Sequence, residues 1–379
     1  MAVQTRSSSV HNVLTQLALL ILAIGVLSAA GCGNGSALAP PITPAAKAQF
    51  GYTANLQSAN LSGYAVDSSS GLLTPLAGFP IASGVNPVFV IHDPLSHYLI
   101  VADIATDMLR VYAINGTTGM LTEVQPSPYL VGREPRALAM DPMGRFVYVA
   151  HQSLNGVVTA FSMNEAGVLT PVPGSPFSTG GNAPSIGCSV VVDPSGKFVF
   201  VVDTSNVYSF GVDSSTGALR LIATAPGPTT GGGLAVDPAG KFLYAVGSGS
   251  NSIFAFTINP TTGEITPSTP SPLALQDGAY TISLDTSGRF AYTVEQGQTL
   301  VAYSVQNGIL TSLGGSYSGA LGSPQLTIDP TGSFIYAPQD GTVNSVSGFR
   351  INASGTLSGL PGSPTPSGQW PFSMTITSQ

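Results

Sequence analysis

A six-residue motif recurs along the chain and constrains its fold more than any other feature of the sequence. Successive copies begin between 44 and 52 residues apart. The copies are DPLSHY, DPMGRF, DPSGKF, DPAGKF, DTSGRF and DPTGSF, beginning at Asp93, Asp141, Asp193, Asp237, Asp285 and Asp329. Repeats of this length are typical of β-propellers and solenoids.

Each copy of the motif reads as a tight turn rather than as one member of a catalytic series. Aspartate in the first position accepts hydrogen bonds from the turn backbone, proline presets the second position, and glycine takes the conformation that other residues avoid. The aromatic residue at the end then begins a strand and packs between repeats. We therefore predict that the six aspartates are structural.

A second motif sets the number of repeats at seven. It is a glycine, any residue, then an apolar residue that is often followed by Thr-Pro, and it begins at Gly71, Gly119, Gly167, Gly217, Gly263, Gly308 and Gly355. The seventh copy of the first motif is divided between the chain ends. Phe50 in QFGYTAN matches the motif aromatic, and residues 371–378, PFSMTITS, match the strand before the turn. We expect these ends to pair, which would remove free sheet edges.

Each repeat reads as four short strands. In the third repeat these are PRALAM at 135–140, FVYVAH at 146–151, NGVVTAFSM at 155–163 and VLTPV at 168–172. No window has the period of a helix. The sequence therefore predicts an all-β protein, a seven-bladed β-propeller of four-stranded antiparallel blades, closed by pairing of its N- and C-terminal strands.

The composition agrees with this fold class and excludes one class of partner. The chain is 43% apolar and 8% charged, with 45 glycines and 30 prolines. That mixture is too apolar for disorder and too rich in turn-forming residues for a helical protein. With 11 basic against 18 acidic residues, it has no basic stretch to neutralise a phosphate backbone. We expect no nucleic-acid partner.

Residues 1–31, at the N-terminus, are expected to be a targeting segment. An apolar run at 13–27, followed by SAAGC ending at Cys32, resembles a bacterial lipoprotein signal peptide. The resemblance implies lipidation of Cys32, the alternatives being an uncleaved anchor or an ordinary signal peptide. We expect a flexible tether at 32–46 and the propeller at 47–379, as a monomer in the cell envelope that meets the membrane only through the lipid.

Cysteines and histidines do not form the patterns of a transition-metal site. Cys188 lies in an apolar run and is expected to be a buried, inert thiol, and no disulfide is possible once Cys32 is lipidated. There is no histidine cluster and no cysteine pair, so we expect no transition-metal site and no cofactor. The open alternative is a calcium ion held by carboxylates from among Asp103, Asp107, Asp203 and Asp340.

A column of mostly polar residues recurs five positions after each motif aromatic. Its members are Asn55, Asp103, His151, Asp203, Gly247, Glu295 and Gln339. We expect this column to ring the central channel. Asp103, His151, Asp203 and Glu295 are the candidate catalytic residues, because a carboxylate or imidazole can act as general acid or base. The alternative is that the column only hydrates the channel mouth.

The stretch VGREPR at 131–136 holds the only local concentration of positive charge. This stretch leads into the predicted first strand of the third repeat, on the same face of the propeller as the column. A guanidinium beside carboxylates suits a polar or anionic ligand. The residues predicted to bind it are Asn55, Asp107, Arg133, Glu134, Arg136, Gln152 and Gln339.

The stretch VADIATDMLRVYAINGTTGML at 101–121 resembles the second blade of the lactonase family of seven-bladed propellers, which includes the 6-phosphogluconolactonases. Asp103 and Asp107 match the V-A-D-L-G-T-D pattern of that family. The strand GRFVYVA from Gly144 and the repeated G-x-L-T turns match as well, and the likeness extends from about Phe50 to the end. It implies the propeller fold and lactone hydrolysis.

The sequence departs from the family at three positions that would belong to the active site. The loop GVNPVFV from Gly84 lacks the family's histidine-rich segment, and His151-Gln152 replace an Asn-Glu pair. An expected Asn-Arg pair is absent from VVDTSN at 201–206 and AVGSGS at 245–250. Fold alone does not decide function, so these departures weaken the expectation of an enzyme.

Two functions follow from these observations. The first is an exported, lipid-anchored module that binds a small molecule or an envelope protein through its polar channel face. The second is a hydrolase of an unphosphorylated sugar lactone, in which a carboxylate or His151 activates water and Arg133 or Arg136 stabilises the oxyanion. We favour binding and leave open whether the chain is an enzyme.

Overall fold

The computed structural model describes residues 48–152, 156–180, 189–297, 299–318, 325–339, 341 and 343–377. The chain divides into two units, Met1–Ala45 and Ala46–Gln379, and every described residue belongs to the second. The expected signal peptide, the tether with Cys32, Cys188 and Asp340 lie outside the described residues. No helix among the described residues has the length and apolar character needed to span a membrane.

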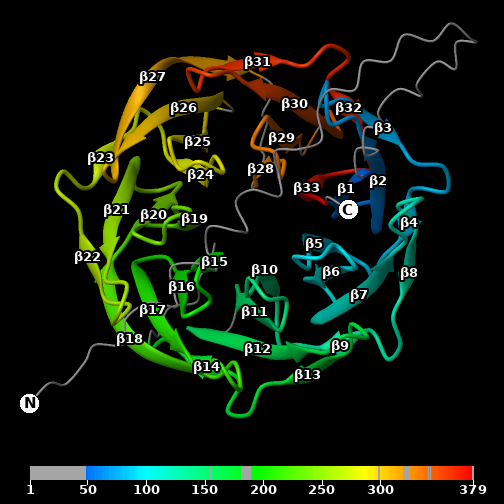
Figure 1. Ribbon diagram of the computed structural model, residues 1–379, viewed down its shortest axis with the longest axis horizontal. Coiled ribbons are helices and arrows are strands. Elements are labelled where there is room, and N and C mark those ends of the chain that lie inside the picture. Colours follow the sequence, from blue (N-terminus) through cyan, green and yellow to red (C-terminus); the bar gives the residue numbers. More distant parts are fainter. Residues whose placement is uncertain are drawn as a thin grey trace, which may run out of the picture. The chain divides into compact units, whose positions relative to one another are not determined.

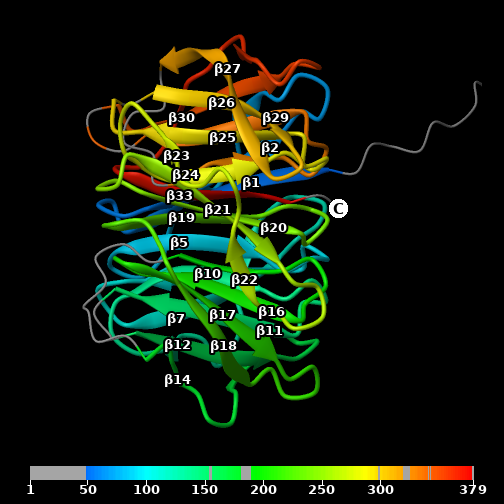
Figure 2. The same ribbon diagram turned by 90° about the vertical axis from the view of Figure 1, so that its left-hand side faces the viewer.

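The second unit is a ring of seven antiparallel sheets around a central channel, as Figure 1 shows from above and Figure 2 from the side. The innermost strands are β33 Pro371–Ile376, β5 Pro87–His92, β10 Pro135–Met140, β15 Ser189–Val192, β19 Gly231–Val236, β24 Ala279–Leu284 and β28 Thr327–Ile328. The second strands are β1 Gln49–Asn55, β6 Tyr98–Asp103, β11 Phe146–His151, β16 Phe198–Val202, β20 Phe242–Gly247, β25 Phe290–Glu295 and β29 Phe334–Gln339. The seven-bladed propeller is confirmed.

The outer half of each sheet completes the blade. The third strands are β2 Asn60–Val66, β7 Met108–Ile114, β12 Val157–Met163, β17 Asn206–Val212, β21 Ser252–Ile258, β26 Thr299–Gln306 and β30 Ser345–Ile351. The fourth strands are β3 Leu73–Pro75, β8 Leu121–Glu123, β13 Leu169–Pro171, β18 Leu219–Pro226, β22 Ile265–Pro267, β27 Ile309–Ser318 and β31 Leu357–Gly359. Four strands per blade were predicted, and each sheet contains these four.

Five sheets carry a further two-residue strand that the sequence analysis did not foresee. These strands are β4 Ile81–Ala82, β9 Tyr129–Leu130, β14 Phe177–Ser178, β23 Leu273–Ala274 and β32 Thr365–Pro366, each paired with the third strand. Prolines lie between them and the preceding fourth strands, and because proline lacks an N–H it interrupts the ladder. β18 and β27 contain no internal proline and run on as single strands.

The two ends of the described chain close the ring. β1 pairs antiparallel with β33, with Gly51 opposite Ile376. The N–H of Thr377 donates to the carbonyl oxygen of Phe50 at 2.8 Å, and the N–H of Phe50 donates to Thr377 Oγ1 at 3.2 Å. Thr377 therefore occupies the place of the motif aspartate, and the predicted closure by terminal strands is confirmed.

The aspartate of every hexapeptide caps its turn, as predicted. One carboxylate oxygen accepts the N–H of the aromatic residue five positions later, at 2.5 to 2.8 Å in all six copies. The aspartate carbonyl accepts a second N–H from the residue three positions later, as between Asp141 and Gly144 at 2.9 Å. All six aspartates are buried, and these bonds satisfy carboxylates that would otherwise be costly to bury.

Successive hexapeptide turns also touch one another around the ring. A Cβ added to Gly144 would lie 3.2 Å from Pro94, one added to Gly196 would lie 3.3 Å from Pro142, and the contact of Gly288 with Pro238 is similar. Glycine therefore suits this position both because its φ is positive and because a Cβ would press on the proline of the preceding turn. In the divergent first copy Ser96 stands at the glycine position with φ 57°, and the preceding repeat, split at the chain ends, has no hexapeptide turn to press against it.

The aromatic residues join each blade to the next. The ring of Phe146 packs against Gly217 so closely that a Cβ added to Gly217 would lie 2.3 Å from it. Phe334 makes the same contact with Gly71, which joins the last blade of the chain to the first. Tyr336 donates its hydroxyl hydrogen to the carbonyl of Gly71 at 2.7 Å. These contacts border apolar clusters between neighbouring sheets, which supply most of the hydrophobic stabilisation.

Replacing Asp193 with Ala should lower the free energy of unfolding by about 1 kcal/mol, because the N–H groups of Ser195 and Phe198 lose their acceptor. Asp193→Asn keeps an acceptor oxygen and should lose less. Denaturant titration measures both values. An Ala variant as stable as the parent protein would show that the carboxylate does not hold the turn.

Replacing Gly217 with Ala should destabilise the protein by about 1–3 kcal/mol more than replacing Gly314, because only Gly217 would drive its Cβ into the ring of Phe146. The two glycines have similar φ, 78° and 72°, so Gly314→Ala controls for backbone strain. Equal losses in chemical denaturation would mean that φ, and not the contact between blades, requires the glycine.

Candidate functional site

The polar column does not line the channel, contrary to the sequence prediction. Its members lie at the ends of the second strands, one strand out from the channel, and the polar members are at most 6% exposed. The column belongs instead to the loops that join second and third strands. The ring of residues expected around the channel is therefore wrong in position.

Two carboxylates of the column cap the loops around them. Asp103 Oδ1 accepts the N–H of Ala105 and of Thr106, and its Oδ2 accepts N–H groups from the loop that enters β5. Asp203 Oδ1 accepts the N–H of Ser205 and Asn206, both at 2.8 Å, and the Tyr208 hydroxyl donates to its other oxygen. These bonds give both carboxylates a structural task of the kind that the motif aspartates perform.

Three further column members bond to side chains of their own sheets. Asn55 donates to Asn60, and Gln339 donates to Ser347. Glu295 Oε1 accepts from the Tyr303 hydroxyl at 2.9 Å. Burial raises the pKa of Glu295, and the nearby charge of Asp277 adds to this, while the hydrogen bonds from Tyr303 and Thr293 oppose it.

His151 is the centre of a small loop cluster that gathers several predicted residues. Its Nδ1 lies 2.9 Å from the carbonyl oxygen of Arg133, so this nitrogen donates. Its Nε2 lies 2.7 Å from Thr159 Oγ1. Burial lowers the pKa of His151, opposed by the Arg133 bond and the charge of Asp107. The lowered pKa favours the neutral ring, with its proton on Nδ1. Thr159 Oγ1 also lies 3.2 Å from the carbonyl oxygen of Val131, so its single hydroxyl hydrogen serves either that oxygen or Nε2 of His151.

Asp107, Glu134 and Gln152 complete this cluster. The N–H of Glu134 donates to Asp107 Oδ1 at 2.8 Å, and the N–H of Gln152 donates to the Glu134 carbonyl at 2.9 Å. Asp107 and Glu134 have positive φ. The equivalent residues of other blades, such as Ala59 and Trp370, do too, so this conformation is a property of the blade rather than a sign of an active site.

The acidic residues considered for calcium do not converge among the described residues. Asp103 and Asp203 are held by backbone N–H groups of their own loops, and Asp107 by Glu134. Within the described ranges, no three histidine, cysteine or acidic residues are arranged to hold a metal ion.

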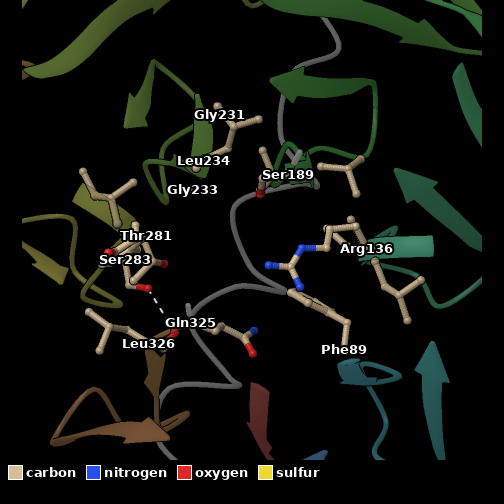
Figure 3. A pocket seen from close by; sticks show the side chains of 18 of the residues that line it. Phe89, Arg136, Ser189, Gly231, Gly233, Leu234, Thr281, Ser283, Gln325 and Leu326 are labelled. Atoms are coloured by element: carbon tan, nitrogen blue, oxygen red, sulfur yellow. Dashed lines mark hydrogen bonds between the residues drawn. The ribbon is translucent and has the colours of Figure 1, made fainter. Parts of the chain in front are cut away.

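A cavity of about 390 Å³ occupies the channel and is lined by residues of the innermost strands and the segments beside them. Arg136 is the single predicted site residue that lines it. Figure 3 shows the Arg136 side chain extending toward the middle of the cavity, with Thr281 and Gln325 among the polar groups around it. Arg136 Cζ lies 4.1 Å from the centroid of the Phe372 ring. None of the described lining residues is an acid or a histidine.

The remaining cavity residues were not predicted from the sequence, although three of the residues that line the cavity share a spacing in it. Arg136, Tyr280 and Phe372 each lie five positions before the turn residue of their blade, Asp141, Asp285 or Thr377. At each of these positions the pairing between first and second strands skips one residue, which forms a bulge. A bulge can re-aim a side chain, and these three line the cavity. Val88, at the corresponding bulge of β5, is buried and does not line it.

Comparison with known proteins points to one family. The family model described as lactonase, 7-bladed beta-propeller, matches residues 82–276. No curated protein sequence matches the chain significantly.

Solved structures show the same fold at low sequence identity. A candidate 6-phosphogluconolactonase from Bacteroides uniformis superposes with a TM-score of 0.75 at 18% identity, over 87% of this chain and 100% of that one. The periplasmic gluconolactonase of Pseudomonas aeruginosa gives 0.72 at 18% identity, over 87% of this chain and 99% of that one. A Lactobacillus plantarum protein superposes with a TM-score of 0.72 at 20% identity, over 87% of this chain and 99% of that one.

Lowering the pH should destabilise the protein partly through His151. Its folded pKa lies below the ordinary 6.5, so the unfolded chain takes up the proton first as the pH falls below about 6.5. The free energy of unfolding should therefore fall between about pH 7 and pH 5, and less steeply in His151→Gln. The pKa of half-buried His92 is also lowered by desolvation, so His92 gives a slope of the same sign in both the parent protein and the variant.

Denaturant titrations at several pH values measure these slopes, and His97→Gln, at an exposed position, is the control. Parallel stability curves for the parent protein and His151→Gln would contradict the neutral, buried imidazole.

Proposed function

Because this chain belongs to the lactonase family of seven-bladed β-propellers, we propose that it is an exported family member that binds a small ligand in its channel cavity without hydrolysing it. The N-terminal pattern ending at Cys32 supports export and lipid anchoring. The cavity volume of about 390 Å³ falls within the range of small-molecule sites, about 300–1,000 Å³.

The observation that supports binding over hydrolysis is the chemistry of the cavity wall. Lactone hydrolysis needs a group that accepts a proton from water within hydrogen-bond reach of the substrate. The described lining residues offer an arginine, hydroxyls, an amide and apolar side chains, and none is a carboxylate or an imidazole. The candidate bases Asp103, Asp203 and Glu295 are buried in separate sheets, in hydrogen bonds that hold those sheets.

Hydrolysis of an unphosphorylated lactone is the second candidate, favoured by the loop cluster around His151. That cluster brings a neutral imidazole and the Asp107 carboxylate together with the backbone of Arg133. In this scheme His151 would accept the proton of water and the exposed Arg133 side chain would stabilise the oxyanion. His151 would first have to break the hydrogen bond between its Nε2 and Thr159 Oγ1, so hydrolysis requires a rearrangement that binding does not.

A pH-stat assay of the purified protein with a panel of sugar and aliphatic lactones separates the two functions. We expect base consumption at the uncatalysed rate, because none of the described residues that line the cavity is a carboxylate or an imidazole. We also expect that components of the same panel, or the hydroxy acids they yield, raise the melting temperature by binding the folded protein.

Turnover that is lost in His151→Gln and kept in Arg136→Gln and His97→Gln would assign hydrolysis to the loop cluster and overturn the proposal. Melting temperatures of the three variants, measured without ligand, show whether a loss reflects unfolding.

A further inference from the structure

We infer that the channel cavity is a carboxylate site, built for a small monocarboxylic acid with a planar apolar body. This inference rests on the proposed binding function and names its ligand class. It follows from how Arg136 is held, what surrounds it and how much room remains.

The guanidinium of Arg136 is placed by the backbone and by an aromatic ring. Arg136 stands at the bulge between Pro135 and Ala137 on an innermost strand, and its side chain lines the cavity. Its Cζ lies 4.1 Å from the centroid of Phe372, which comes from the strand that closes the ring. Stacking on an aromatic ring fixes the plane of a guanidinium, and its N–H groups lie in that plane as a rigid fork that matches a carboxylate.

Positive charge in the cavity opposes the charge of the whole chain. The chain has a formal net charge of −7, yet Arg136 is the single charged residue among the described residues that line the cavity. A charge in a confined, partly apolar site interacts more strongly with a counter-ion than it does in water. The cavity therefore favours one negative charge.

The polar groups of the wall differ in what they can offer a ligand. The Ser283 hydroxyl donates to the Leu326 carbonyl at 3.1 Å and is already engaged. Gln325 Oε1 accepts the N–H of Met374 at 3.1 Å, which orients the amide. Ser189 and Thr281 add hydroxyls to the wall. A single cation with a few hydroxyls suits a carboxylate better than a phosphate, whose second charge would need another partner.

The remaining wall is apolar and includes aromatic side chains. Phe89 and Phe372 line the cavity, and Tyr280, which is 38% exposed, stands where the inner strands begin. Aromatic rings favour planar, weakly hydrated groups between them. At about 30 Å³ per water-sized group, a cavity of about 390 Å³ holds roughly a dozen non-hydrogen atoms. An acid with a single ring fits that volume.

Isothermal titration calorimetry of the purified protein with benzoate, benzyl alcohol and inorganic phosphate tests this inference. We expect benzoate to bind and both other probes to bind at least about ten-fold more weakly. Arg136→Gln should weaken benzoate about ten- to a hundredfold, the effect of losing hydrogen bonds to a charged group. Arg220→Gln removes the same charge at an exposed position of β18 and should leave benzoate affinity unchanged.

Tyr280→Ala is a second variant that keeps the test valid if Arg136→Gln does not fold, because Tyr280 is exposed at the rim. It should weaken benzoate several-fold without weakening phosphate. Equal affinities for benzoate and benzyl alcohol, or benzoate binding unchanged in either cavity variant, would overturn the carboxylate site. So would a protein that binds none of the probes.

Failure of this inference is distinguishable from failure of the proposed function. Binding of neutral lactones without turnover would keep the binding function and remove the carboxylate preference. Turnover of lactones in the pH-stat assay would remove the binding function whatever the calorimetry shows.

Discussion

The pairing of β1 with β33 is the contact on which the rest of the structure depends. Each sheet packs only against its two neighbours, so a ring that failed to close would expose an apolar face on both sides of the gap. Closure also places Gly71 against Phe334 and Tyr336. Because the seven inner strands surround one channel only when the circle is complete, the cavity that holds Arg136 is a product of this pairing. β33 itself contributes Phe372 to that cavity.

Polar side chains in this protein divide into two populations with different tasks. One population, which includes the motif aspartates and the column from Asn55 to Gln339, is buried and satisfies backbone or side-chain groups in turns. The other lines the channel, where Arg136 stacks on an aromatic ring. The first population stabilises the blades, since a buried carboxylate without these partners would be costly. Only the second combines charge, open volume and apolar walls.

The sequence predicts the fold well because short local motifs for turns and strands recur in every repeat. Residues 135–140 and 146–151 were assigned as strands and are β10 and β11 with the same bounds. The site was harder to predict. A polar residue at the end of a strand looks the same whether it caps a loop, as Asp103 does, or faces a channel. The bulge that re-aims Arg136 comes from the pairing of two strands, which the periodicity of one strand does not reveal.

Because successive hexapeptide turns are in contact, the residues that one repeat accepts depend on those of the repeat before it. A Cβ on Gly196 would lie 3.3 Å from Pro142, and one on Gly144 would lie 3.2 Å from Pro94, so a larger residue at either glycine presses on a proline about fifty residues earlier in the chain. The residue at the glycine position of one repeat is therefore restricted by the proline of the repeat before it. Ser96 follows the repeat whose turn is replaced by the chain ends, and its hexapeptide, DPLSHY, differs most from the other five. Where the ends of the chain meet, the contact between turns is missing, and a residue with a side chain takes the place of glycine.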